Sequence, residues 1–238
     1  VKYTNHEDVF EWEVLYLTEN GEKNLFSGTC KDFLLLPSLT LLNEVPLSLW
    51  INDKEGTSGM NTMSDLEVKT VVKKDTNWLM NTTIATNYDE ICFAVRGDSK
   101  YAELVVANEA GILSQVRVDG KINAYALTKD YILCGLRDWE ETGKCHILRY
   151  DFKADEKENF STQGELYRMC GGTKNDALCV DMHFNIYRID GDAGRLEKIN
   201  GVFGFANMPV VFRPIFDNQV ICAYLKDDIY SYYLLRLE

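Results

Sequence analysis

The 238 residues carry a formal net charge of −12, and 46% of them are hydrophobic. This hydrophobic content is ordinary for a packed globular chain and too high for a disordered one. The negative charge argues against general binding to nucleic acids or to anionic membranes, because both present charges of the same sign. No run of about 18 apolar residues occurs, so the sequence predicts no membrane span.

A single domain is expected over residues 1–238. Only four prolines occur, and no segment is rich enough in proline or serine to indicate a linker. The acidic residues are spread along the chain, which is typical of a solvated acidic surface.

The first eighty residues contain three expected strands. They are residues 10–17, followed by the hairpin-type pair Asn20-Gly21, then residues 47–51 and residues 66–72. Residues 52–65 are polar and contain glycine, so we expect a long exposed loop there.

A repeat of about 43 residues begins near residue 89. Four segments share an Asp or Asn, a short and mostly apolar run, and a cysteine, and the four cysteines are Cys92, Cys134, Cys179 and Cys222. They are separated by 42, 45 and 43 residues. Other strand-like runs precede and follow each cysteine, with turn pairs such as Asp119-Gly120 between them. A period in the forties is typical of the four-stranded blades of a β-propeller.

The recurring cysteine has a packing explanation. The inner strands of a blade are buried on both faces, and free cysteine behaves there as a small apolar side chain. Chain length divided by the period gives about 5.5, so we expect five or six blades, with six preferred. The last segment, residues 229–238, resembles a third strand, and we expect Tyr230, Tyr232 and Tyr233 to pack within its blade. Residues 10–17 would add the missing outer strand, close the ring and cover an exposed edge.

These features resemble the broad β-propeller superfamily, which includes WD40-like and TolB-like repeats, over residues 80–238. The Gly-His and Trp-Asp pairs of a typical WD40 blade do not recur here. The resemblance therefore points to the superfamily and to no family within it. It implies an all-β fold of five to six four-stranded blades.

Seven cysteines are present, an odd number that leaves at least one thiol without an intrachain partner. Cys170 and Cys179 bracket the turn-like residues 171–176, so a disulfide between them is one interpretation and a reduced pair is the favoured one. Buried free cysteines favour a reducing compartment, hence the cytoplasm. The sequons at Asn81 and Asn159, or a leader removed before Val1, would instead indicate an exported or cell-surface protein.

No motif for a metal site, a phosphate-binding loop or a catalytic serine occurs, so we expect no cofactor and do not favour an enzyme. Asp181 and His183 would share one face of a strand, and we favour a strand-end hydrogen bond over a metal or acid–base role. Cys145 and His146 are adjacent and would point to opposite faces of a strand, which argues against a catalytic dyad.

Two groups of residues are candidates for binding. Asp89, Asp130 and Asp176 recur just before the cysteine runs, where equivalent blades would place them on one rim as an acidic ring for a cation or a sugar. The alternative is that they stabilise tight turns. Arg137 and Trp139 lie in a predicted hairpin, and such residues are common binding anchors, although Trp139 would equally pack on its own blade.

We therefore expect a non-enzymatic scaffold that presents its loops to a protein partner. The alternative is a cell-surface propeller that binds a carbohydrate or another small-molecule ligand. This alternative includes a glycosidase-like enzyme. Because propellers host many functions, the fold alone does not choose between the two.

Overall fold

The computed structural model describes residues 1–19, 21–64, 67–97, 101–137, 145–162, 164–171, 174–183, 185–199, 211–214, 219–226 and 229–236. These residues form 22 strands and one short 3-10 helix, η1, at Phe33–Leu35. In the described parts of the chain, no helix is long and apolar enough to cross a membrane.

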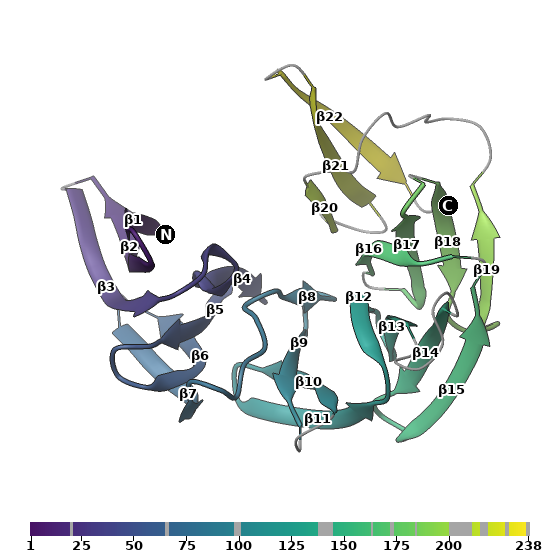
Figure 1. Cartoon of the computed structure of the whole chain (residues 1–238), viewed down its shortest axis with the longest axis horizontal. Helices are drawn as coiled ribbons and strands as arrows, with labels where there is room; N and C mark the ends of the chain where they lie inside the picture. Colours follow the sequence, from purple (N-terminus) through teal and green to yellow (C-terminus); the bar gives the residue numbers. More distant parts are fainter. Residues whose placement is uncertain are drawn as a thin grey trace. The chain divides into compact units, whose positions relative to one another are not determined.

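The strands form six sheets, and within each sheet they lie side by side in chain order (Figure 1). Four sheets have four strands: β4 (Ser38–Leu42), β5 (Val45–Asn52), β6 (Thr57–Ser64) and β7 (Glu67–Asp75); β8 (Ala85–Thr86), β9 (Ile91–Arg96), β10 (Ala102–Asn108) and β11 (Gly111–Val118); β12 (Lys121–Leu127), β13 (Tyr131–Arg137), β14 (Cys145–Asp151) and β15 (Glu156–Ser161); β16 (Leu166–Cys170), β17 (Asp176–Asp181), β18 (Ile186–Asp190) and β19 (Arg195–Lys198).

Two sheets have three strands within the described residues. They are β1 (Lys2–His6), β2 (Val9–Thr18) and β3 (Gly21–Cys30), and β20 (Val211–Pro214), β21 (Gln219–Lys226) and β22 (Ile229–Arg236). An all-β chain built largely of four-stranded antiparallel sheets confirms the predicted fold class.

The chain divides into two compact units by its internal contacts. Unit 1 consists of residues 1–84 and 93–117, and unit 2 of residues 85–92 and 118–238. The expectation of a single domain stays a prediction.

The repeated cysteines occupy equivalent places in the fold. Cys92, Cys134, Cys179 and Cys222 lie in β9, β13, β17 and β21, the second strand of four successive sheets, and all four are fully buried. Burial raises the pKa of each of these thiols, that of Cys222 to about 12. Each cysteine is therefore a protonated, small core side chain, as the repeat predicts.

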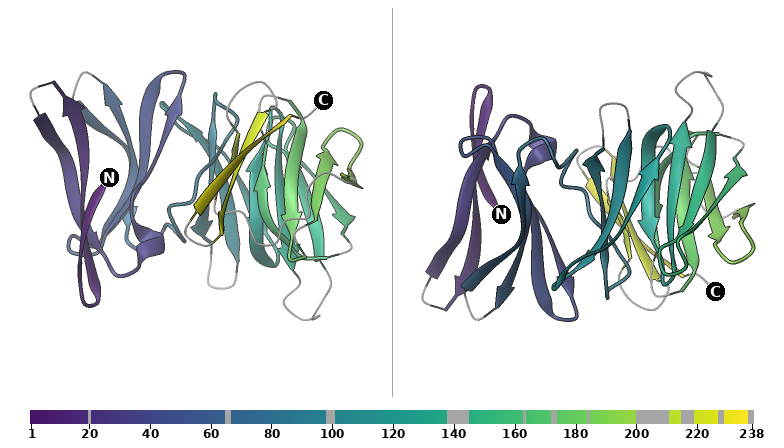
Figure 2. Two further views of the ribbon diagram at one scale, coloured as in Figure 1. Left: turned by 90° about the horizontal axis from the view of Figure 1, so that it is seen from above. Right: turned by 90° about the horizontal axis from the view of Figure 1, so that it is seen from below.

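In unit 2, neighbouring sheets pack through small and branched side chains. The first strands of successive sheets are neighbours, since β8 contacts β12, β12 contacts β16 and β16 contacts β20 (Figure 1). Figure 2 shows the same strands from two further sides. One core cluster joins Ala126 and Leu133 of one sheet to Met169, Ala177 and Cys179 of the next. Alanine and cysteine at these positions let the backbones approach closely.

Unit 1 has an aromatic core between its first two sheets. Trp12 and Val14 of β2 pack with Trp50 of β5 and Met63 of β6. The indole nitrogen of Trp12 also donates a hydrogen bond of 3.2 Å to the carbonyl oxygen of Ile51. The first sheet is therefore fixed to the second by both packing and hydrogen bonding.

The long loop predicted at residues 52–65 is wrong, because most of it is strand β6. Its side chains are polar, yet Ser58, Asn61 and Thr62 are buried beside Met60 and Met63. Pairing with β5 and β7 on both sides places the strand inside the core whatever its polarity. Only residues 53–56 form the turn.

The predicted closure of the last sheet by residues 10–17 is also wrong. These residues lie in β2, which pairs with β1 on one edge and β3 on the other, so neither edge is free for another sheet. In the described residues β22 is an edge strand. Tyr232 and Tyr233, expected to be packed, are accordingly 65% and 40% exposed, and the Tyr230 side chain lies outside the described residues.

The alternative disulfide is not formed, because all seven cysteines are free. Cys170 stands opposite Leu178, and Cys179 opposite Met169. The two sulfurs therefore belong to opposite faces of the sheet, and the favoured reduced pair is confirmed.

Candidate functional site

One end of the sheets in unit 2 carries a continuous set of bonded turns, which we call the turn rim. It consists of residues 87–90, 128–130 and 174–175, which precede β9, β13 and β17, and of the outer turns 152–155 and 191–194. The side-chain amide of Asn87 donates a 2.8 Å hydrogen bond to the carbonyl oxygen of Thr128. The backbone N–H of Lys129 donates to the carbonyl oxygen of Lys174 at 3.2 Å. Hydrogen bonds thus join the turn of each of these sheets to the next.

Asn175 is the centre of the turn rim. Its Oδ1 accepts a 3.0 Å hydrogen bond from the backbone N–H of Asp130. Its Nδ2 donates to Oδ2 of Asp130 at 3.0 Å and to Oδ1 of Asp192 at 2.9 Å. The hydroxyl of Tyr131 donates to the same Asp192 oxygen at 3.1 Å. The pKa of Tyr131 is raised mainly by burial and further by this hydrogen bond. One amide therefore holds two carboxylates from different turns.

Asp130 forms an ion pair with a neighbouring lysine. Nζ of Lys153 lies 2.7 Å from Oδ1 of Asp130. The hydrogen bonds from Lys153 and then Asn175 hold the pKa of Asp130 below its usual value, and the pairing raises the pKa of Lys153. Both groups are charged at neutral pH, and each stabilises the other within the rim.

Arg149 ties the outer turns to this network. Its guanidinium donates to the carbonyl oxygens of Gly191 at 2.5 Å and Asp192 at 3.0 Å, and it pairs with Glu158. The backbone N–H of Gly191 in turn donates to the carbonyl oxygen of Asn175 at 3.0 Å. Arg149 of β14 thus fixes the turn between β18 and β19 in the neighbouring sheet.

Local contacts surround each of the three predicted acids. Asp176 pairs with Arg188 at 2.6 Å, Asp130 pairs with Lys153, and Asp89 is exposed with its backbone N–H bonded to Oδ1 of Asn87. Within the described ranges, no group of three or more His, Cys, Asp or Glu residues could hold a metal ion. These contacts favour the turn-stabilising interpretation, and a binding role for the three acids stays a prediction.

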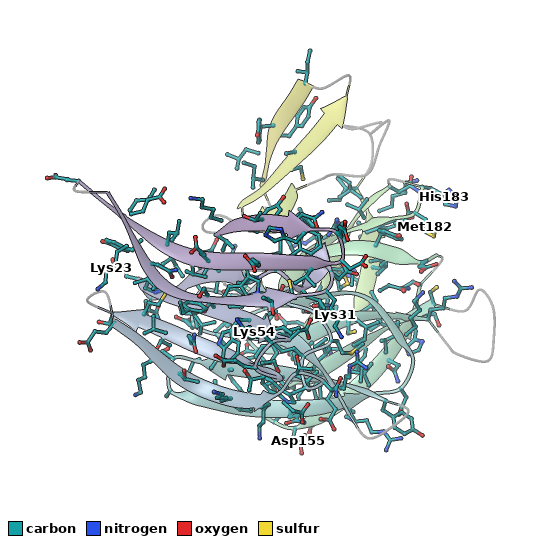
Figure 3. The ribbon with its side chains drawn as sticks, turned by 60° about the vertical axis from the view of Figure 1, so that its left-hand side comes forward. Lys23, Lys31, Lys54, Asp155, Met182 and His183 are labelled. Carbon is teal, nitrogen blue, oxygen red and sulfur yellow. The ribbon has the colours of Figure 1, made fainter. Side chains whose placement is uncertain are left out.

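Arg137 belongs to the second predicted group and lies at the other end of β13. Asp130 precedes β13 and Arg137 ends it, so the two are separated by the strand, about 20 Å. Arg137 pairs with Glu165 at 3.5 Å, whereas Trp139 lies outside the described residues. In Figure 3 Met182 and His183 project from the turn after β17, far from Asp155 of the turn rim. Asp130 and Arg137 therefore lie at opposite ends of β13.

Asp181 confirms the expected strand-end hydrogen bond. Asp181 is 5% exposed. Its Oδ1 accepts hydrogen bonds from the backbone N–H of His183 at 2.8 Å and from that of Asn185 at 2.9 Å. Its Oδ2 accepts from Nδ2 of Asn185 at 2.8 Å and from the hydroxyl of Tyr187 at 3.0 Å. Burial alone would raise the pKa of Asp181, but these hydrogen bonds outweigh it and lower the pKa. Burial and the bond to Asp181 raise the pKa of Tyr187 to about 12. The Asp181 carboxylate therefore holds the turn after β17 and the Tyr187 side chain in place.

Sequence reasoning missed the partners that complete the turn rim. Asn175, Tyr131, Arg149 and Asp192 each come from a different turn or strand, and none has a recurrent counterpart in all repeats. The sequence repeat locates the turns before the cysteine-bearing strands. It does not indicate which outer turns form hydrogen bonds with them.

Replacing Asn175 by aspartate tests the network. The variant would bring a third carboxylate against Asp130 and Asp192 and lose both amide donors. We expect Asn175→Asp to lower the free energy of unfolding by about 2 kcal/mol at neutral pH, and by more than Asn175→Ala does. The difference in free energy of unfolding between Asn175→Asp and Asn175→Ala should become smaller at acidic pH, because the carboxylates become protonated there. Equal losses at both pH values, measured by urea unfolding, would contradict this arrangement.

Comparison with known proteins shows only the fold. No protein-family model matches the sequence, and no curated protein matches it. The β-propeller domain of the Trilobed protease from Pyrococcus furiosus, described as having an open velcro topology, matches with a TM-score of 0.64 and 9% identity over 100% of this chain and 81% of that one. The acylaminoacyl peptidase of Pyrococcus horikoshii matches with a TM-score of 0.61 and 13% identity over 98% of this chain.

The chain spans 44% of the length of the acylaminoacyl peptidase structures that it matches. The WD40 repeats of RRP9 match with a TM-score of 0.54 and 8% identity over 83% of this chain and 62% of that one. TolB from Acinetobacter baumannii is also among the similar structures. Together with the six chain-ordered sheets of the described residues, these likenesses show that the chain has the β-propeller fold, and they confirm its structural resemblance to WD40-like and TolB-like proteins.

Proposed function

We propose that the chain is a protein-interaction propeller that presents the turn rim of unit 2 to a protein partner. The observation that carries the proposal is the bonding between turns, in which Asn87, Asn175 and Arg149 fix loops of neighbouring sheets to one another. A surface held in one conformation before binding loses little entropy when a partner docks, which favours recognition.

The chemistry of the described residues supports binding over catalysis. The four repeat thiols are buried and their pKa values are raised, so they are poor nucleophiles. The pKa values of Asp130 and Asp181 are lowered rather than moved toward neutrality, and both carboxylates are fully engaged by donors. A general acid or base instead needs a pKa near the working pH.

Exposed charges of both signs line the turn rim. Asp89, Asp155 and Asp192 carry negative charge, and Lys129, Lys153 and Lys174 carry positive charge. Complementary charges on a partner would fix its register more than they would raise its affinity. A specific protein surface is therefore the partner that this rim fits.

Charge reversal at matched positions tests the proposal. Lys129 and Lys121 are both exposed and flank the same strand, β12, at its two ends. A protein captured from the native cell extract by the wild-type chain should also be captured by Lys121→Glu, and should be lost with Lys129→Glu/Lys174→Glu. Equal capture by all three baits, or no specific capture by the wild type, would contradict a role for the turn rim.

A second candidate is a propeller that accompanies a catalytic domain in a longer chain. The similarity to less than half of an acylaminoacyl peptidase favours it. Sequencing the full transcript separates the two candidates, because a catalytic domain in the same reading frame would support the second. The carbohydrate-binding alternative gains no support from Asp130 and Asp176, because each is paired with a cation of its own sheet.

We also propose a reducing location such as the cytoplasm. Seven free cysteines, most of them buried, support this.

A further inference from the structure

In unit 1, strands β5 and β6 bury three polar side chains on one face. Ser48 is 0%, Asn61 4% and Trp50 7% exposed. Ser48 and Asn61 stand directly opposite each other, and Trp50 follows Ser48 by two residues, so all three share a face. Trp50 and Met63 on this face pack against Trp12 and Val14, so the face points toward the first sheet.

These side chains carry polar atoms without a hydrogen-bond partner among the described residues. The atoms are Oγ of Ser48, Nε1 of Trp50 and Oδ1 of Asn61. Buried polar groups in folded proteins are nearly always hydrogen-bonded, to protein or to ordered water. Three such groups on one face of one strand pair therefore indicate something that bonds to all of them.

The backbone register places the three residues close together on this face. Side chains that stand opposite each other on antiparallel strands have Cβ atoms about 5 Å apart. Gly59 stands opposite Trp50, and Cζ2 of the indole lies 3.1 Å from the position that a Cβ on Gly59 would occupy. Because Gly59 has no side chain, the indole edge lies over β6, the strand that carries Asn61.

The donor and acceptor set fits water. The indole N–H only donates, the Asn61 carbonyl only accepts, and the Ser48 hydroxyl does either. A water molecule accepts one bond and donates two here, and about three bonds are typical of buried water. The neighbours Trp12, Val14 and Met63 are uncharged, which disfavours an ion.

We infer that Ser48, Trp50 and Asn61 form an internal water site between the first two sheets of unit 1. The bound water completes the hydrogen bonding of β5 and β6 and holds the Trp50 indole in the orientation that packs against Trp12. The site also gives Asn61, one of the buried polar side chains of β6, a hydrogen-bond partner.

Thermal unfolding of Ser48→Ala tests the site, with Ser58→Ala as a matched control. Ser58 is equally buried, and its hydroxyl donates to the carbonyl oxygen of Asp75 at 2.6 Å. If water satisfies Ser48, both substitutions remove a made hydrogen bond, and each should lower the melting temperature by about 3 °C. If nothing bonds to Ser48, removing its hydroxyl relieves an unpaired buried group, and Ser48→Ala should raise the melting temperature while Ser58→Ala lowers it.

A high-resolution crystal structure supplies the second measurement. We expect a water oxygen within hydrogen-bonding distance of the Ser48 hydroxyl, the Trp50 indole nitrogen and the Asn61 amide oxygen. A direct Ser48–Asn61 hydrogen bond with no water between them, or a raised melting temperature for Ser48→Ala, would overturn the inference.

Discussion

Replacing Gly191 by alanine should lower the free energy of unfolding by about 3 kcal/mol. A Cβ on Gly191 would lie 2.2 Å from the carbonyl oxygen of Asn175 and 3.0 Å from Cδ2 of Tyr131. The first contact is with backbone, which cannot rotate away. The added methyl would therefore separate the turns that Asn175 and Arg149 hold together.

The matched control is Gly164→Ala, because a Cβ at Gly164 meets nothing within 4 Å. Its effect on urea unfolding should stay within about 0.5 kcal/mol. Similar unfolding midpoints for the two variants would show that the turns of the rim are not packed as described.

Removing the carboxylate of Asp181 should cost about 3 kcal/mol in the free energy of unfolding. Asp181→Ala would leave the backbone N–H groups of His183 and Asn185 and the hydroxyl of Tyr187 without their acceptor in a buried site. Asp89→Ala, at an exposed turn position, is the control and should change stability by about 0.5 kcal/mol or less. Comparable losses for the two variants would contradict the structural role of Asp181.

The pH dependence of Asp181 has a definite sign. Its pKa is lowered in the folded protein, so its contribution to stability is complete above the ordinary carboxyl pKa of about 3.9 and is lost as the pH falls through the lowered value. Asp181→Asn should therefore be less stable than the wild type at neutral pH, and the gap should narrow below about pH 4. A gap that widens in acid would be inconsistent with a lowered pKa.

The strand pattern of the second half was predictable because packing imposes it. Strands β9, β13 and β17 are buried on both faces, so each reads as a short apolar run into which a small side chain such as Cys134 or Cys179 fits. The Asp or Asn before each run marks a turn by its own backbone hydrogen bonding. Local chemistry therefore repeats whenever the tertiary environment repeats.

Strand β6 escaped prediction for the opposite reason. Ser58, Asn61 and Thr62 are buried because β6 pairs with β5 and β7 and its sheet packs in the core, and their own residue types do not indicate this. A window centred on these residues contains neither an apolar run nor an alternating pattern, and so resembles a loop. The satisfaction of their polar atoms depends on the whole sheet and its neighbour.

The candidate site was predictable in position and not in composition. Asp130 directly precedes β13 and Asp176 begins β17, but their cations, Lys153 and Arg188, lie 23 and 12 residues away on other strands or turns. Asn175 contacts Asp130 across 45 residues. Such pairs follow from how sheets stack, which a single sequence does not record.

Residue-by-residue thiol labelling tests most directly the claim that four cysteines occupy equivalent buried places in successive sheets. After brief exposure of the native protein to a maleimide, peptide mass spectrometry should find Cys145, which is partly exposed, labelled first. Cys92, Cys134, Cys179 and Cys222 should be protected to a similar degree, and all seven should react after denaturation. Rapid labelling of any one of those four in the native protein, or fewer than seven reactive thiols in the unfolded one, would contradict the repeated architecture.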